Sequence, residues 1–152
     1  MLVDVSTYLP CRPEQAIHHA CTSRLLQYVA DPLLKLVPKE PSRLPETWSE
    51  GTYRVSMYLF GFLPFGAQAV VISFPESKNA FCVRDNGYGS RIRKWDHFVT
   101  IEQAGDGTLY RDRVTIEAGI LTPFVWALAQ VFYRHRQRRW RRLVAHSFNY
   151  AA

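Results

Sequence analysis

The end of this chain constrains its fold more than any other part. After a series of segments with the alternating pattern of strands, Leu121-Thr-Pro-Phe124 begins one long helical stretch. That stretch carries the large apolar side chains of Trp126, Leu128 and Phe132, so one of its faces needs a covering layer. Strands followed by a single long helix predict an α+β fold, in which a curved antiparallel sheet wraps around the helix and leaves a cavity between the two layers.

The same helix also carries the excess charge of the protein. It runs into the basic block Arg134–Arg142, which holds 6 of the 19 Lys and Arg residues. The other 13 basic residues match the 13 acidic ones, so the net charge of +6 belongs to this helix and not to the whole surface. At helical spacing Arg134, Arg138, Arg141 and Arg142 share one side. The side that includes Arg136 also holds Phe132, Trp140 and Leu143, which indicates that part of the block abuts the core.

Length and composition favour one globular domain over residues 1–152, with a core that buries about two-thirds of the unfolded surface. Hydrophobic residues make up 47% and aromatic residues 14%, which excludes a disordered chain. The first ten residues have neither the basic start nor the apolar run of a secretory signal. Cys11, Cys21 and Cys82 are an odd number without CxxC spacing, so we interpret them as free thiols in a reducing compartment, by default the cytoplasm.

Two uncharged stretches raise the possibility of a membrane protein. Val55–Pro75 has no charge over 21 residues, the length of a spanning helix. Its central glycines and proline instead favour a hairpin that turns at Phe62-Leu-Pro-Phe-Gly66. Ala118–Tyr133 is followed by arginines, but with 16 residues it is too short to span a bilayer. These patterns argue against an integral membrane protein and leave peripheral association open.

Alternation and turn residues predict the remaining elements. Val3, Val5 and Thr7 indicate a first strand, and two short helices follow, one from Pro13 and one over Arg24–Ala30. Pro38, Pro41 and Pro45 indicate a long irregular connection. The chain then reads as a meander, with strands near residues 52–60, 67–74, 79–85, 91–102 and 108–118. The turns between them are expected at Phe62–Gly66, Pro75–Lys78, Asp85–Ser90 and Ala104–Gly107.

The last two strands allow their register to be predicted. With a loop at Ala104–Gly107, Val99 lies opposite Asp112 and Lys94 lies opposite Glu117. This register gathers most of the apolar side chains on one face, which we expect to be the inner one. Its residues are Trp95, His97, Val99, Ile101, Tyr110, Asp112, Val114 and Ile116.

This order of elements resembles the helix-grip plan of the START/polyketide-cyclase-like superfamily (SRPBCC) over about residues 1–147. The resemblance is carried by four segments in order: Trp48-Ser-Glu-Gly51, Arg91-Ile-Arg-Lys-Trp-Asp-His97, Thr108-Leu-Tyr-Arg-Asp112 and Ala118-Gly-Ile-Leu-Thr122. It implies a deep apolar cavity between the sheet and the terminal helix. It implies no single activity, because members include lipid carriers, hormone receptors, aromatic cyclases and quinone-binding proteins, and they share no catalytic residues that could be assigned here.

The expected cavity points to binding of a hydrophobic small molecule, such as a lipid, an isoprenoid or an aromatic metabolite. The candidate ligand-binding residues are Met57, Trp95, His97, Val99, Tyr110, Asp112, Val114, Trp126 and Phe132. His97 and Asp112 are diagonal neighbours on the inner face, within reach of each other. They form either an acid/base pair beside a ligand, as in a cyclase, dehydratase or hydrolase, or a hydrogen-bonded pair that satisfies two buried polar groups.

The sequence offers no reason to expect a cofactor or a metal, because no metal-ligand spacing and no phosphate-binding loop is present. The basic helix allows a third function, that of an adaptor for an acidic partner or an anionic membrane surface, with Arg134, Arg138, Arg141 and Arg142 as the contacting residues. The charge balance elsewhere argues against nucleic acid. The oligomeric state is left open by the sequence.

Overall fold

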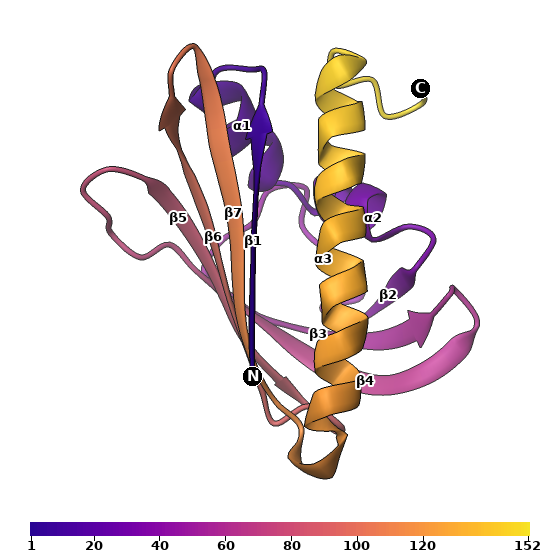
Figure 1. Cartoon of the computed structure of the whole chain (residues 1–152). Helices are drawn as coiled ribbons and strands as arrows, with labels where there is room; N and C mark the ends of the chain where they lie inside the picture. Colours follow the sequence, from indigo (N-terminus) through magenta and orange to yellow (C-terminus); the bar gives the residue numbers. More distant parts are fainter.

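The computed structural model describes residues 1–152 and contains one seven-stranded antiparallel sheet with three α-helices. The spatial order of the strands is β1-β7-β6-β5-β4-β3-β2, so the two ends of the sheet come from the first and second strands of the chain. In Figure 1 the sheet curves around α3, which crosses its inner face. The strands are β1 (Leu2–Leu9), β2 (Leu34–Glu40), β3 (Gly51–Leu59), β4 (Leu63–Ser73), β5 (Phe81–Gly89), β6 (Lys94–Ala104) and β7 (Gly107–Glu117). The helices are α1 (Pro13–Ala20), α2 (Ser23–Ala30) and α3 (Thr122–Ala145).

This arrangement is the START-like helix-grip fold that the sequence predicts. The β6–β7 register is confirmed, with Val99 opposite Asp112 and Lys94 opposite Glu117. Of the eight side chains expected on the inner face, seven are buried and Trp95 is half-buried. The register follows from the alternation of apolar residues, because a slip by one position would turn the inner side chains of one strand toward water.

The start of α3 explains why the chain changes here from strand to helix. The hydroxyl of Thr122 accepts a hydrogen bond from the Ala118 amide at 2.8 Å and donates one to the Gly119 carbonyl at 2.7 Å. Pro123 follows in the first turn, where its missing N–H is not needed. The buried residues of α3 then recur every three or four positions and form the stripe that faces the sheet: Val125, Ala129, Tyr133, Arg136, Gln137, Trp140, Leu143 and Val144.

The long connection predicted around Pro38, Pro41 and Pro45 is wrong in its first part, because Leu34–Glu40 forms the edge strand β2. It pairs with β3 through Leu34 opposite Leu59 and Leu36 opposite Met57. Pro38 lies in this strand just before the register shifts. An edge strand and an irregularity in the ladder are the two places in a sheet that tolerate proline, so the prolines do not prevent the strand from forming.

Two predicted turns are also misplaced. The β3–β4 hairpin turns at residues 60–62, where Phe60 and Gly61 have positive φ, and not at Phe62–Gly66. A register shift after Met57 places Gly66 opposite it within the ladder, so that glycine belongs to a strand. Asp85–Ser90 is likewise no turn, because β5 continues to Gly89 and pairs with β6 up to Gly87.

The two short helices cover one end of the groove between sheet and helix. Thr22 caps α2 by accepting a hydrogen bond from the Leu25 amide at 3.2 Å, and Leu25 and Val29 of that helix are buried. α2 packs against α3, while α1 packs against β6 and β7. None of the helices is both long and apolar enough to cross a bilayer.

Candidate functional site

An apolar cavity of about 210 Å³ lies between α3 and the curved half of the sheet. It is far larger than the ~10–15 Å³ that a single water needs. Seventeen of the 21 residues in its wall are hydrophobic, so the cavity is suited to an apolar molecule. The wall comes from α2, β2–β6 and α3, and its four polar residues are Gln68, Asp85, His97 and Arg136. Phe60 and Val131 also belong to it and are more than half exposed, which places the opening between the β3–β4 hairpin and the middle of α3.

The structure brings only some of the predicted ligand-binding residues to this wall. Met57, Trp95, His97 and Phe132 line the cavity. Val99 and Tyr110 line an adjoining cavity of about 60 Å³, whose wall also includes His97.

Asp112, Val114 and Trp126 belong to neither cavity. Asp112 and Val114 are fully buried in the sheet. Trp126 faces the first strand instead, and its indole N–H donates to the Leu2 carbonyl at 2.8 Å. Helical spacing showed that Trp126 is on the apolar side of α3, but not that this side faces β1 at the start of the helix.

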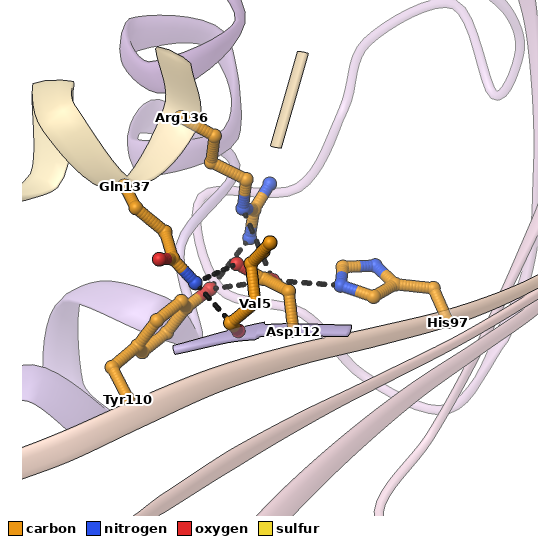
Figure 2. Close-up of polar contacts among 6 residues, drawn as sticks. All are labelled: Val5, His97, Tyr110, Asp112, Arg136 and Gln137. Carbon is orange, nitrogen blue, oxygen red and sulfur yellow. Dashed lines mark hydrogen bonds and ion pairs between the residues drawn. The ribbon is translucent and has the colours of Figure 1, made fainter. Parts of the chain in front are cut away.

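Asp112 is the centre of a buried polar network between the sheet and α3, as Figure 2 shows. Its Oδ1 lies 2.8 Å from His97 Nε2, 3.3 Å from the hydroxyl of Tyr110 and 3.5 Å from Arg136 Nε. Its Oδ2 accepts a hydrogen bond from Gln137 Nε2 at 3.1 Å. Arg136 Nη2 in turn donates to the Tyr110 hydroxyl at 2.9 Å. Both carboxylate oxygens are therefore used, and the network ties the last sheet strand to the long helix.

The charges of this network follow from its contacts. Burial alone would raise the pKa of Asp112, but the Arg136 guanidinium and the hydrogen bonds from His97 and Gln137 hold it below its ordinary value. Burial lowers the pKa of His97, against the opposing effect of Asp112, so the imidazole is neutral at neutral pH. Burial also opposes the charge of Arg136, but its neighbours Tyr110 and Asp112 raise its pKa, so the guanidinium stays charged.

These states fix the tautomer of His97. An ionised carboxylate can only accept hydrogen bonds, so Nε2 of His97 carries the proton and donates it to Asp112. Nδ1 is then an acceptor with a free lone pair, and it makes no hydrogen bond within the protein. Figure 2 shows this second nitrogen turned away from Asp112. A histidine held in this way can accept a hydrogen bond or a proton from a molecule in the cavity.

Asp85 is a cavity residue that the sequence reading missed. It lies directly opposite His97 in the β5–β6 ladder and lines both cavities. Its Oδ1 accepts a hydrogen bond from the Val71 amide at 2.8 Å, while its other oxygen has no protein partner. Burial raises the pKa of Asp85 to about 7, so this carboxyl is largely protonated in slightly acidic solution. Because the Asp-Asn-Gly sequence is typical of a turn, Asp85 was not predicted to lie in a strand that lines the cavity.

Arg136 and Tyr133 were also absent from the predicted site. Helical spacing already placed Arg136 beside Phe132 and Trp140, and this was the signal that it faces inward. The ring of Tyr133 lies 5.0 Å from that of His97 and 6.0 Å from that of Trp95, so it covers one side of the imidazole.

No three His, Cys, Asp or Glu side chains gather as metal ligands would.

The basic block of α3 divides between surface and core. Arg134, Arg138, Arg141 and Arg142 are exposed, as the helical spacing predicts, and Arg141 donates a hydrogen bond to the Thr7 hydroxyl at 2.8 Å. Trp140 is fully buried within the block, so it packs in the core and does not reach a lipid surface.

Comparisons with solved structures agree with the fold. A START superfamily protein from Mycobacterium smegmatis superposes with a TM-score of 0.64 at 16% identity, over 95% of this chain and 97% of that one. Protein TTHA0849 from Thermus thermophilus superposes with a TM-score of 0.64 at 14% identity, over 98% of this chain and 100% of that one. Protein Ms6760 from Mycobacterium smegmatis superposes with a TM-score of 0.67 at 10% identity, over 96% of this chain and 92% of that one. At these identities the likeness concerns the fold.

Sequence comparison adds a family. A family model described as "Domain of unknown function (DUF8410)" matches residues 8–144. A search of curated proteins finds no match.

Proposed function

The chain belongs to the DUF8410 family, whose description gives no activity, so we propose a function from the cavity itself: the protein binds a hydrophobic small molecule as a carrier or accessory protein. The ligand class is a lipid, an isoprenoid or an aromatic metabolite. The observation that carries the proposal is the cavity of about 210 Å³ with its predominantly apolar wall. The START-like fold supports it, because this fold is generally associated with hydrophobic small molecules.

The energetics favour an occupied cavity. Each CH₂ group that moves from water into an apolar site contributes about 0.8 kcal/mol, so a ligand of eight to ten carbons gains several kcal/mol. Association and ordering of the ligand offset part of this gain.

The proposal is tested by native mass spectrometry of protein purified from its own host, followed by extraction and identification of the bound molecule. Ala129→Phe fills the cavity, because Ala129 lies on its wall. Ala127→Phe makes the same change on the exposed side of the same helix and is the matched control. We expect an additional noncovalent mass on the wild type and on Ala127→Phe and none on Ala129→Phe. A wild-type protein without additional mass, or an unchanged load on Ala129→Phe, would contradict binding in this cavity.

His97 supports a second candidate, a cyclase, dehydratase or hydrolase in which this residue acts as the acid/base group. The 2.8 Å contact with Asp112 orients the ring, and Nδ1 has no protein partner. For a reaction in the cavity, His97→Ala should lower kcat at least about a hundredfold, far more than it weakens ligand binding. Equal turnover in wild type and variant would exclude an acid/base role for this residue.

We also propose that the protein approaches anionic membranes through the exposed face of α3. The four guanidiniums of Arg134, Arg138, Arg141 and Arg142 support this, as does the absence of any acidic residue from the helix. A basic group near an anionic bilayer contributes about 1 kcal/mol. A carrier of an apolar ligand gains from such contact, because its ligand enters and leaves through membranes.

A further inference from the structure

Three of the four polar residues of the cavity wall, all except Gln68, gather at one place. His97 and Arg136 both contact Oδ1 of Asp112, at 2.8 and 3.5 Å, and Asp85 faces His97 across the β5–β6 ladder. The same three residues, His97, Arg136 and Asp85, also line the smaller cavity that lies beyond the larger one. They therefore form a polar end to a cavity whose other walls are apolar except at Gln68, whose Oε1 is buried without a hydrogen-bond partner.

Hydrogen-bonding groups at this polar end are left without protein partners. Arg136 is only 7% exposed, yet its Nη1 makes no hydrogen bond with the protein, whereas its Nε has only the 3.5 Å ion pair with Asp112. His97 offers the lone pair of Nδ1, and Asp85 offers one carboxyl oxygen. An unfilled donor and an unfilled acceptor in the wall of one cavity are complementary to a hydroxyl group, which both donates and accepts, and the guanidinium alone is complementary to a carbonyl oxygen.

The charges at the polar end are balanced in slightly acidic solution, where the Asp85 carboxyl is mainly protonated because its pKa is about 7. Arg136 is positive and Asp112 is negative, at an ion-pair distance of 3.5 Å, and His97 is neutral. A bound carboxylate would add a buried negative charge without a free positive partner, beside two aspartates. A bound ammonium would lie next to Arg136. Either ion would lose its hydration without compensation, whereas a neutral oxygen would not.

We infer that the cavity selects neutral molecules in which an apolar body ends in a hydroxyl or carbonyl oxygen, held by His97 and Arg136. This inference rests on the proposed binding function and specifies its ligand class. It excludes fatty acids and long-chain amines of the same size as preferred ligands. In this inference Arg136 recognises the ligand by donating a hydrogen bond to its oxygen. It does not bind an anion, because Asp112 already neutralises its charge.

The test compares four eight-carbon probes, 1-octanol, octanoate, octylammonium and n-octane, by competition with a fluorescent apolar probe at pH 6. At this pH the Asp85 carboxyl is mainly protonated, since its pKa is about 7. We expect 1-octanol to bind at least about tenfold more tightly than octanoate and octylammonium. An ion that binds as tightly as the alcohol would overturn the inference and leave hydrophobic binding intact. If none of the four probes competes, the binding function itself fails, and the inference with it.

A variant separates the hydrogen bond from the general preference of an apolar cavity for neutral molecules. His97→Phe keeps an aromatic ring and removes the acceptor. It should weaken 1-octanol binding about three- to tenfold, the ratio that one hydrogen bond provides. n-Octane makes no hydrogen bond, so it should bind the variant no more weakly than the wild type. Equal weakening of both probes would mean that the substitution only disturbs the wall, and would overturn the assignment of the oxygen to this residue. The four-probe comparison on the wild type decides the ligand class even if this variant does not fold.

Discussion

The Nε2 atom of His97 lies 2.8 Å from Oδ1 of Asp112, although the two residues stand 15 positions apart on neighbouring strands. The contact joins the wall of the apolar cavity, where His97 lies, to a carboxylate that is fully buried behind it. Because Arg136 and Gln137 of α3 bind the same carboxylate, Asp112 also fixes the helix on the sheet. The proposed ligand site and the fold therefore share one network.

Asp112→Asn should destabilise the protein by about 3–5 kcal/mol, since it leaves the buried Arg136 without its counter-charge. Urea unfolding at pH 7 measures the loss. Asp4→Asn is the control, because Asp4 forms a bidentate pair with Arg111 at the surface, where ion pairs contribute about 0–1 kcal/mol. Similar losses of unfolding free energy for both variants would show that the buried network stabilises the protein no more than a surface ion pair does.

Asp112→Asn combined with Arg136→Met should cost less than the sum of the two single changes. Each single change leaves one buried charge unpaired, whereas the double variant removes both charges. We expect a coupling free energy of about 1–3 kcal/mol from the four unfolding curves. Additive losses would show that the 3.5 Å pair does not interact in the folded state.

Asp85→Asn should make the protein more stable, and most clearly above pH 7. The pKa of Asp85 is raised from its ordinary 3.8 to about 7, so the folded state keeps a proton that the unfolded state releases. The carboxyl of the wild type therefore destabilises the fold increasingly as the pH rises from about 4 to about 7, and fully above that.

We expect a gain of about 2 kcal/mol for Asp85→Asn at pH 8 and almost none at pH 4. Full burial with this shift would give ~4 kcal/mol, and the value is smaller because Asp85 is only half-buried. The asparagine oxygen can still accept the hydrogen bond from Val71. Thermal unfolding of both proteins from pH 4 to pH 8 measures the difference, and a gain that does not depend on pH would contradict the raised pKa.

Replacement of Arg134, Arg138, Arg141 and Arg142 by glutamine should lower the affinity for anionic lipid vesicles at least about a hundredfold at low salt. The loss follows from about 1 kcal/mol for each basic group near the surface. Co-sedimentation with neutral and anionic vesicles measures it, and the difference should shrink at high salt.

A matched control removes the same charge elsewhere, by replacement of Arg43, Arg54, Arg91 and Arg93, which are also exposed. If both quadruple variants lose the same affinity, the net charge binds the vesicles and not this face of the helix.

The sequence could predict those features that depend on alternation and helical spacing. The β6–β7 register and the buried inner face followed from single-residue alternation, and with them the approach of His97 to Asp112. The start of α3 near Pro123 was also predicted correctly, because the residues that end the last strand and begin the helix are neighbours in the sequence.

Other features were missed because a local signal pointed to a different structure. Asp85-Asn-Gly is typical of a turn, but here β5 continues through it. Gly87 instead allows a close approach of β4, since a Cβ at that position would lie 2.8 Å from the Ala69 carbonyl oxygen. The role of Arg136 depends on which side of the helix faces the sheet at that turn, and helical spacing indicates only its neighbours along the helix.

The central claim, that an apolar molecule occupies the cavity between α3 and the sheet, is tested most directly by intermolecular NOEs between bound 1-octanol and assigned methyl groups. We predict NOEs to the methyls of Met57 and Ala129, which line the cavity from opposite layers. Ala127 and Ile120 are exposed on the outside of the protein near or within the same helix and serve as internal controls. NOEs confined to these two exposed methyls would contradict the account, because they would place the ligand on the surface and leave the cavity empty.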